Sequence, residues 1–230
     1  MKNIKTIILG CGHIVNLFTF RYNIFRSVKF PILWGGVNIS LDIKRKDRIV
    51  LTTIEIIHEL GFQGLTTKEI SRREQFSEGT LYKHFRSKDE IILAALDYCS
   101  KFDEDIKQTI VLKKLTSKES IRYLITRYAE YYEKYPAMTA ILNSYEILRN
   151  EAGIAHKIIE IFEFDFDLMM NIIEEGIKNG EFKSDIDSDN FSDVILGFRN
   201  EITLRWRMRQ YNFNLKDKLL ATLNMVLKAY

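Results

Sequence analysis

The polar side chains between Thr66 and Glu90 are the part of this 230-residue chain with the clearest chemical capacity. Over the sequence TTKEISRREQFSEGTLYKHFRSKDE, hydroxyl, phenol, imidazole and ammonium groups are interspersed with apolar residues. Groups of these types donate hydrogen bonds to phosphate oxygens and to the edges of bases. They can act together only if short helices hold them at a fixed angle, as a DNA-binding helix-turn-helix does.

Hydroxyl residues predict the helices that must hold these side chains. Thr66 or Thr67, Ser77 and Ser87 each precede a stretch that favours helix, so that each hydroxyl can accept from a free backbone N–H group. Glu90 stands three residues after Ser87, which is the spacing of a capping box. The segment is thus expected to form two short helices joined by a tight turn, with a third helix directly after them. The expected inner face is Ile70, Phe76, Leu81 and Phe85.

The stretch GTLYKHFRSKDEI resembles the recognition helix of the tetracycline-repressor (TetR) family of bacterial and archaeal transcription regulators. Upstream, IVLTTIEIIHELGFQGLTTKEIS resembles the first two helices of that family, and the likeness runs from about Lys46 to Ala95. It implies a helix-turn-helix whose second helix enters the major groove of DNA. The turn departs from the pattern, because Gln75-Phe76, with Glu74 before them, stand where relatives usually have Ala-Gly-Val. The missing glycine puts the geometry of the turn, though not the motif, in question.

The resemblance also assigns roles to single side chains. Thr67 is implied to contact the DNA backbone, and Glu78, where relatives often carry Lys or Arg, would repel phosphate or accept from a cytosine amino group. Three side chains are implied to reach phosphates, namely Tyr82, His84 and Lys88. Three more lie where base edges or adjoining phosphates are read, namely Gly79, Thr80 and Lys83. The full set of expected DNA contacts is Lys46, Thr66, Thr67, Ser77, Glu78, Gly79, Thr80, Tyr82, Lys83, His84 and Lys88. Alternatives stay open: Tyr82 as half-buried packing, and His84 and Lys88 as ordinary surface residues.

The composition speaks against an enzyme. The sequence holds no H-E-x-x-H, no Gly-rich phosphate loop and no Cys–His pair, and its histidines are scattered. Cys11 and Cys99 are too few and too far apart for a disulfide framework or a zinc site, which fits a reducing compartment. We therefore expect a cytoplasmic protein without catalytic residues, bound metal or cofactor.

The formal net charge of +3 is unevenly distributed. Residues 41–90 hold ten basic and nine acidic groups, whereas residues 91–230 hold 19 basic and 22 acidic groups. DNA affinity must then come from local placement, such as Lys44-Arg45-Lys46 and Arg48, rather than from global charge. The same basic stretch is also consistent with a solvated tail.

Helical periodicity continues after the motif and predicts an all-α fold. We expect an N-terminal three-helix helix-turn-helix DNA-binding domain at residues 41–95 and a C-terminal helical ligand-binding and dimerisation domain at residues 96–230. The expected helices of the second domain are Ile91–Ile106, Ser117–Tyr135, Ala137–Arg149, Ala155–Lys178, Ser188–Arg209 and Leu215–Ala229.

The stretch EEGIKNGEFKSDIDSDNF resembles the C-terminal part of the same family, in which the last two long helices pair with those of a second subunit. Apolar residues at steps of three and four suit such a four-helix seam, although they suit a monomeric core as well. A homodimer would match a near-palindromic DNA site. The residues expected at the interface are Val194, Phe198, Ile202, Trp206, Leu220, Leu223 and Leu227.

A regulator of this family would also need an effector pocket among the central helices. Aromatic and polar residues there suit a lipophilic or aromatic ligand, and Arg127 is the best candidate for an anionic group on it. An aromatic stripe at helical spacing is also typical of an ordinary core. The expected lining is Tyr123, Arg127, Tyr128, Tyr131, Phe162 and Phe166.

Residues 1–40 differ from the rest, because they contain five basic groups and no acidic one. Three interpretations compete: a signal or anchor segment, an additional helix that packs on the body, and upstream sequence translated from a start codon placed too early. We treat them as an N-terminal extension that is non-native or disordered.

Taken together, these features predict a ligand-responsive, homodimeric DNA-binding regulator, most simply a repressor released by a small lipophilic or aromatic effector. The expected partners are double-stranded DNA, a small-molecule effector and a second copy of the chain, without a membrane. The alternative is a helical protein-binding adaptor that keeps the fold but has lost DNA binding, and Glu78 and the absent glycine favour it. The steep salt dependence of phosphate contacts would separate the two.

Overall fold

Long helices dominate residues 45–229, the part of the chain that the computed structural model describes. The sequence favours helices because it contains only two prolines. Ten α-helices, two 3₁₀ turns and no strand occur within the described range, which confirms the all-α class. The elements are α2 (Arg45–Leu60), η1 (Phe62–Gly64), α3 (Thr67–Glu74), α4 (Glu78–Leu81), α5 (Lys88–Lys113), α6 (Ser117–Lys134), η2 (Pro136–Met138), α7 (Thr139–Leu142), α8 (Tyr145–Leu148), α9 (Ala155–Lys178), α10 (Ser188–Met208) and α11 (Leu215–Ala229).

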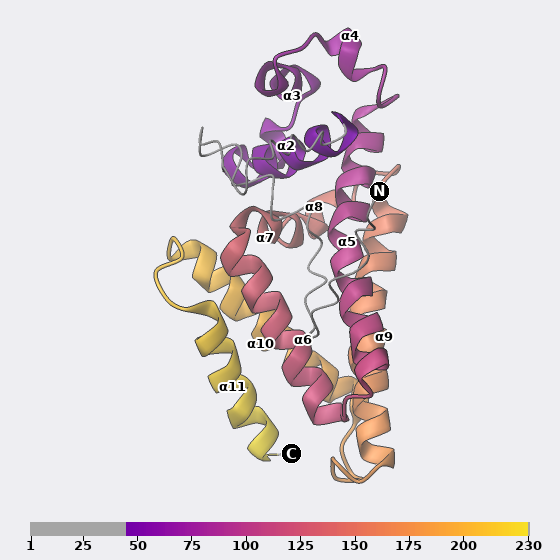
Figure 1. Ribbon diagram of the computed structural model, residues 1–230, viewed down its shortest axis with the longest axis vertical. Helices are drawn as coiled ribbons and strands as arrows, with labels where there is room; N and C mark the ends of the chain where they lie inside the picture. Colours follow the sequence, from indigo (N-terminus) through magenta and orange to yellow (C-terminus); the bar gives the residue numbers. More distant parts are fainter. Residues whose placement is uncertain (1–44, 230) are drawn as a thin grey trace, which may run out of the picture. The chain divides into compact units, whose positions relative to one another are not determined.

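Helices α2, α3 and α4 gather at the N-terminal end of α5 (Figure 1). The predicted caps at Thr66, Ser77 and Ser87 are confirmed, since each hydroxyl accepts a backbone N–H bond from the residue three positions later, at 3.1 to 3.3 Å. These caps fix where α3, α4 and α5 begin. The predicted inner face is buried at Ile70, Leu81 and Phe85 and partly buried at Phe76.

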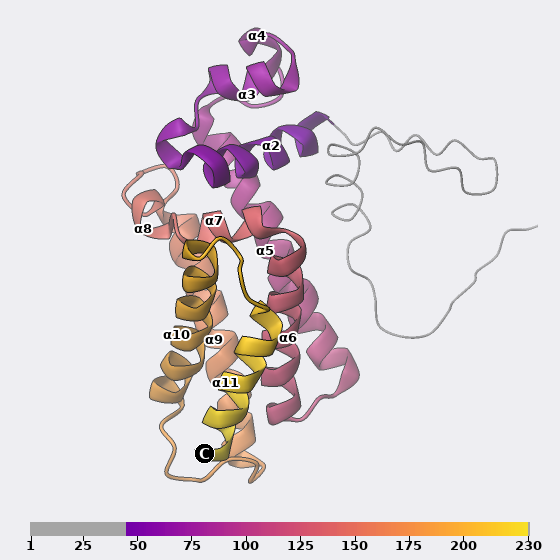
Figure 2. The ribbon, with the colours of Figure 1, turned by 90° about the vertical axis from the view of Figure 1, so that its left-hand side faces the viewer.

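The long helices α5, α6, α9, α10 and α11 pack lengthwise against one another (Figures 1 and 2). Two carboxylates fix their ends across the bundle. Glu181 accepts from the backbone N–H groups of Ser117 and Lys118 at 2.9 and 3.0 Å, and Glu133 accepts from those of Leu215 and Lys216 at 2.7 and 3.1 Å. Negative charge at a helix N-terminus is stabilising, so these bonds hold α6 and α11 in place.

The prediction of one helix from Ala137 to Arg149 is wrong. The chain instead forms η2, α7 and α8 there. Pro136 opens a tight 3₁₀ turn, and the side chains of Asn143 and Ser144 donate to the carbonyls of Thr139 and Ala140 at 2.8 Å. Such bonds from side chain to backbone compete with a continuous helix.

The start of α6 also differs by one residue from the prediction. The cap is Thr116 rather than Ser117, and Thr116 forms a full capping box with Glu119.

The proposals for residues 1–40, and for Lys44, lie outside the described residues. No described helix has both the length and the apolarity that crossing a lipid bilayer requires.

Candidate nucleic-acid interface and core cavity

The turn between α3 and α4 keeps a left-handed residue although it contains no glycine. Gln75 has φ 58° and ψ 42°, and its N–H donates to the carbonyl of Arg72 at 3.4 Å. The N–H of Phe76 donates to the carbonyl of Ser71 at 3.1 Å, which completes the end of the helix. The sequence left this geometry open, and the structure shows that the tight turn survives with Gln75 in the strained position.

A Gln75→Gly variant is therefore expected to be more stable than the wild type by about 0.5 to 1 kcal/mol, because glycine adopts this backbone conformation without the clash of a Cβ atom. The midpoint of urea unfolding measures the effect. The matched control is Lys68→Gly, which places glycine inside α3 and should cost about 1 kcal/mol. Equal destabilisation by both changes would contradict the role given to Gln75.

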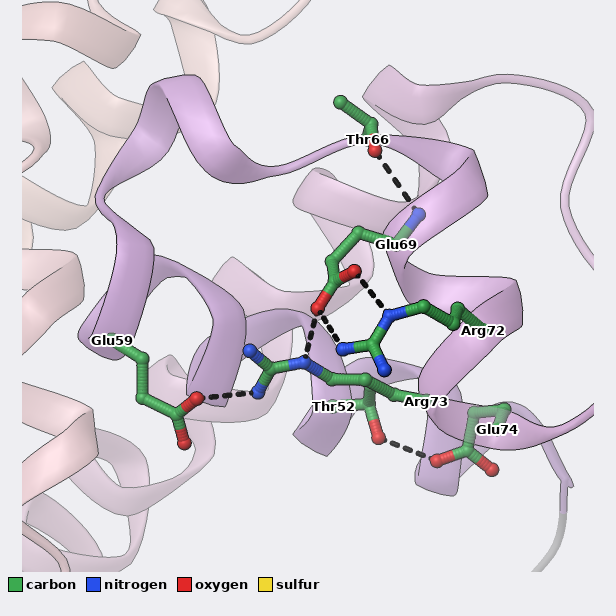
Figure 3. A network of polar contacts seen from close by, with 7 residues as sticks. All are labelled: Thr52, Glu59, Thr66, Glu69, Arg72, Arg73 and Glu74. Carbon is green, nitrogen blue, oxygen red and sulfur yellow. Dashed lines mark hydrogen bonds and ion pairs between the residues drawn. The ribbon is translucent and has the colours of Figure 1, made fainter.

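An ion-pair network binds α2 to α3 and neutralises two arginines of the motif (Figure 3). The Glu69 carboxylate accepts from Arg72 at 2.8 Å and from Arg73 at 2.7 Å, and Arg73 also lies 2.8 Å from Glu59 on α2. Hydrogen bonds from Arg72 and then Arg73 lower the pKa of Glu69 to about 2. Both arginines are thus paired within the protein, and Arg73 ties α3 to α2.

Glu74 makes a second tie to α2. It is 7% exposed, and it accepts from the Thr52 hydroxyl at 2.5 Å while Arg48 lies 2.6 Å from its other oxygen. Buried charge is tolerated where it is paired, and here Oε2 has the ion pair with Arg48 but no hydrogen bond. Glu74, one of the residues that departs from the family pattern, thus fixes the angle at which α3 leaves α2.

The residues expected to meet DNA lie mostly on the outer side of the motif. Tyr82 is 52% exposed, so about half of its surface is free for a contact, and Lys83 and Gly79 are exposed as well. Glu78 accepts from the Thr67 hydroxyl at 2.6 Å, so these two predicted contacts are engaged with each other. The Glu78 carboxylate is thereby directed to its own protein.

The remaining predicted contacts are held near the motif in different ways. Lys46 lies 5.1 Å from the ring centre of Phe85, and Lys88 lies 4.9 Å from that of Phe62. Both are cation–π contacts that keep an ammonium group close to α3 and α4 without neutralising its charge. Thr66 and Ser77 serve as caps, Thr80 is partly buried with its hydroxyl 3.1 Å from that of Ser77, and His84 is partly buried.

A cavity of about 440 Å³ lies among the long helices α5, α6, α9 and α10 and the short helices α7 and α8. Aromatic rings form much of its wall, including Phe102 stacked on Tyr131 with ring centres 4.1 Å apart. Apolar residues such as Ile141 and Leu196 also line the cavity. A mostly apolar cavity with a few polar groups is the usual form of a small-molecule site.

Two partly buried polar pairs lie in this wall. Arg199 is 3% exposed and donates to both oxygens of Asp165, at 3.1 and 2.5 Å, while its guanidinium lies 4.8 Å from the ring centre of Tyr128. The Tyr128 hydroxyl donates to Asp103 at 2.6 Å. Burial is the main cause that raises the pKa of Asp103 to about 7.

Four of the six residues predicted to form the effector pocket line this cavity, namely Tyr128, Tyr131, Phe162 and Phe166. Tyr123 and Arg127 do not. Tyr123 packs under Lys113, and Arg127 forms an ion pair with Glu130 at 2.7 Å. The arginine of the cavity is Arg199, which sequence reasoning missed. An Arg in the apolar stripe of α10, four residues after Ile195, was the signal that could have revealed it.

The residues predicted for the dimer interface divide into two groups. Ile202, Trp206 and Leu223 are buried within their own subunit, so they are core residues rather than an exposed seam. Val194 is 41% exposed, whereas Phe198, Leu220 and Leu227 are partly buried. Apolar residues recur at steps of three and four on two faces of α10 and α11. This spacing alone does not indicate which face packs in the core and which could contact a partner. Other large apolar side chains exposed on these helices are Leu204, Met208 and Met225.

Hydrogen bonds of Arg207, called here the Arg207 joint, connect α2 of the motif to α7 and α10, two of the helices around the cavity. Arg207 of α10 donates to Thr139 of α7 at 2.9 Å and lies 3.2 Å from Nδ1 of His58 in α2. Burial, and then the charge of Arg207, lower the pKa of His58, while Glu59 raises it. The imidazole is therefore held neutral, and it accepts from the guanidinium.

This joint gives folding a dependence on pH. Because the pKa of His58 is lower in the folded state, its contribution to stability is complete above the unfolded value of 6.5 and is lost as the pH falls through the folded value. Between about pH 7.5 and about pH 5 the wild type should lose more unfolding free energy than His58→Asn, whose amide oxygen can still accept but does not titrate. Urea unfolding of both proteins across this pH range tests the prediction. If the free energy of unfolding changes with pH equally in the two proteins, then His58 does not cause the pH dependence.

Comparison with known proteins agrees with this geometry. Residues 49–95 match the family model described as bacterial regulatory proteins, tetR family, and residues 97–229 match that of the YsiA-like protein, C-terminal region. The fatty acid metabolism regulator protein of Bacillus subtilis is 25% identical over 186 residues, which cover 79% of this chain and 91% of the relative. The HTH-type transcriptional regulator QacR of Staphylococcus aureus is 30% identical over 139 residues, or 60% of this chain and 73% of the relative.

Solved structures show the same fold. FadR of Bacillus subtilis in complex with stearoyl-CoA superposes with a TM-score of 0.66 at 22% identity, over 80% of this chain and 98% of that one. The ketosteroid transcriptional regulator KstR2 of Mycobacterium tuberculosis gives a TM-score of 0.69 at 20% identity, over 81% of this chain and 94% of that one. With a capped helix-turn-helix, a helical body around a cavity and family models that match both halves, the chain is a member of the TetR family of bacterial transcriptional regulators.

Proposed function

We propose that this protein is a cytoplasmic, homodimeric repressor that binds a near-palindromic DNA operator and leaves it when a small lipophilic or aromatic effector fills the cavity. The observation that carries the proposal is the exposure of Tyr82 and Lys83, directly after α4, in a motif whose arginines Arg72 and Arg73 are already paired. Side chains without an internal partner are free to bind phosphates and base edges.

Dimerisation supplies the affinity that one short helix lacks. The exposed apolar residues Val194, Leu204, Met208 and Met225 on α10 and α11 support pairing of these helices between two subunits. A symmetric dimer presents two recognition helices to half-sites about 34–36 Å apart, so that every phosphate contact counts twice.

The effector is proposed to act through two connections that run from the cavity to the motif. Helix α5 begins beside the motif at Lys88 and contributes Cys99, Phe102 and Asp103 to the cavity wall. The Arg207–His58 bond joins α10 to α2. Filling the cavity would favour one arrangement of these helices, and the effector can weaken DNA binding only as far as it binds that arrangement more tightly. The stearoyl-CoA bound to the relative from Bacillus subtilis supports a lipophilic ligand.

The binding of the full-length protein to DNA from around its own gene, followed by fluorescence anisotropy across a salt series, tests this function. The expected result is tight binding with a slope of log affinity against log salt of about −5 or steeper, since at least six phosphates are neutralised per dimer. An adaptor that has lost DNA binding would show weak association that salt abolishes equally for every sequence. That second outcome would contradict the repressor.

A further inference from the structure

The charges around the cavity are unbalanced. Four carboxylates line it, and Arg199 is the one basic side chain among the described lining residues. Glu146 and Asp193 are exposed, whereas Asp103 and Asp165 are partly buried and belong to the polar pairs described above. An anionic group entering this space would meet an excess of negative charge in a medium of low dielectric constant.

Arg199 uses four of its five N–H groups within the protein. Both terminal nitrogens donate to Asp165, Nη2 and Nε also donate to the amide oxygen of Asn200 at 3.2 and 3.3 Å, and the guanidinium lies over the ring of Tyr128. A ligand carboxylate could form a bidentate pair with Arg199 only by displacing Asp165. That would leave a partly buried aspartate without its partner, which is costly.

The same wall suits a cation. Tyr128, Tyr131 and Phe102 line the cavity, and aromatic rings attract positive charge where water is excluded, as the Arg199 guanidinium over the ring of Tyr128 illustrates. Asp103 accepts one hydrogen bond, from Tyr128, and a carboxylate has capacity to accept others.

We infer that the effector carries a positive charge on its lipophilic or aromatic body and that Asp103 is the counter-ion for this charge. The inference rests on the proposed function in one respect, namely that the cavity is the effector site. It also argues against a fatty acyl effector, because this lining would repel the carboxylate or phosphate groups of such a molecule.

Binding of such a cation must be coupled to a proton. The pKa of Asp103 is raised to about 7 by burial, opposed by the hydrogen bond from Tyr128, while Asp165 on α9 and Glu104 on α5 raise it and Arg199 on α10 lowers it. The thiol of Cys99 and the phenols that face Asp103 stay protonated near neutral pH, because burial raises their pKa values. A bound cation favours the ionised carboxylate, so its affinity should rise with pH through about 7, with release of a proton.

The test uses three probes that share one ring system and differ in charge: 10-methylacridinium, neutral 9-methylacridine and acridine-9-carboxylate. Isothermal titration of the full-length protein without DNA, near pH 8, should show the cation binding at least about tenfold more tightly than the neutral compound and no binding of the anion. Titration near pH 7 in buffers of different ionisation enthalpy should reveal a proton released with the cation alone.

Two variants assign the effect to a residue. Asp103→Asn should weaken the cation by about tenfold or more, leave the neutral compound unchanged and remove the proton release. Glu146→Gln, which neutralises an exposed carboxylate at the rim, should have a much smaller effect because solvent screens it. Equal affinity for the three probes, preference for the anion, or failure of the cation to bind would overturn the inference. The affinity of the wild type for DNA, measured separately, decides the proposed function independently.

Discussion

An Arg199→Met protein is expected to lose about 3 kcal/mol of folding free energy, because the change removes the partner of Asp165 and leaves that carboxylate in the cavity wall. Arg199 is 3% exposed and donates to both oxygens of Asp165, so solvent cannot replace it without opening the packing between α9 and α10. Urea unfolding at fixed protein concentration measures the loss, since the stability of a dimer depends on concentration.

Two controls separate the lost pair from general damage to the core. The double variant Arg199→Met/Asp165→Leu should recover most of the stability, because well-packed apolar residues can replace a buried ion pair at little cost. Lys157→Met, which removes ion pairs with the exposed carboxylates of Asp97 and Glu160, should change stability by less than about 1 kcal/mol. If the double variant is no more stable than Arg199→Met, then the cost arises from packing and not from the unpaired charge.

A Tyr82→Ala protein is expected to bind operator DNA about 30-fold more weakly, with an equal loss on unrelated DNA. Tyr82 is 52% exposed on the outer side of the motif, and a contact worth about 1 kcal/mol per subunit is lost twice in a dimer. A phosphate contact carries no sequence information, which is why both kinds of DNA should be affected alike. Fluorescence anisotropy with operator and scrambled duplexes measures both losses.

Matched variants make this result specific. Tyr82→Phe isolates the hydroxyl group from the ring, and Tyr123→Ala removes a tyrosine that stacks with Lys113 far from the motif, so it should leave DNA affinity unchanged. Lys83→Met, by contrast, should change the preference among operator sequences, because its position is one where base edges are read. A Tyr82→Ala protein that keeps the affinity of the wild type would show that the outer face of α4 does not meet DNA.

Local sequence patterns predicted most of the motif, because its helix caps depend on interactions between residues that are close in the chain. The hydroxyl caps at Thr66, Ser77 and Ser87 are set by residues three positions apart, and Gly180, with φ 73°, ends α9 through a similarly local preference. The turn was the exception. Nothing in the sequence says that Gln75 takes a left-handed conformation, because the surrounding helices rather than the residue impose it.

Long-range relations escaped prediction. The position of Arg199 against Asp165 depends on how α9 and α10 pack. Arg127, which the sequence indicated as the arginine of the pocket, instead pairs with Glu130 and does not line the cavity. The division of the α10 and α11 stripes into core and surface has the same cause. Periodicity shows that Ile202 and Val194 belong to a helix with apolar faces, whereas only the packed neighbours show that the first is buried and the second exposed.

We propose that a symmetric dimer of this chain binds a specific DNA sequence. The most direct measurement is selection of fragments of its own genome by the purified full-length protein, followed by sequencing. A symmetric dimer should enrich an inverted repeat with half-sites centred about one helical turn, roughly 10 base pairs, apart. Tyr82→Ala should enrich the same repeat but recover less DNA, because its affinity falls for every sequence alike. Enrichment of no sequence, or of an asymmetric site that Tyr82→Ala recovers equally well, would contradict the proposal.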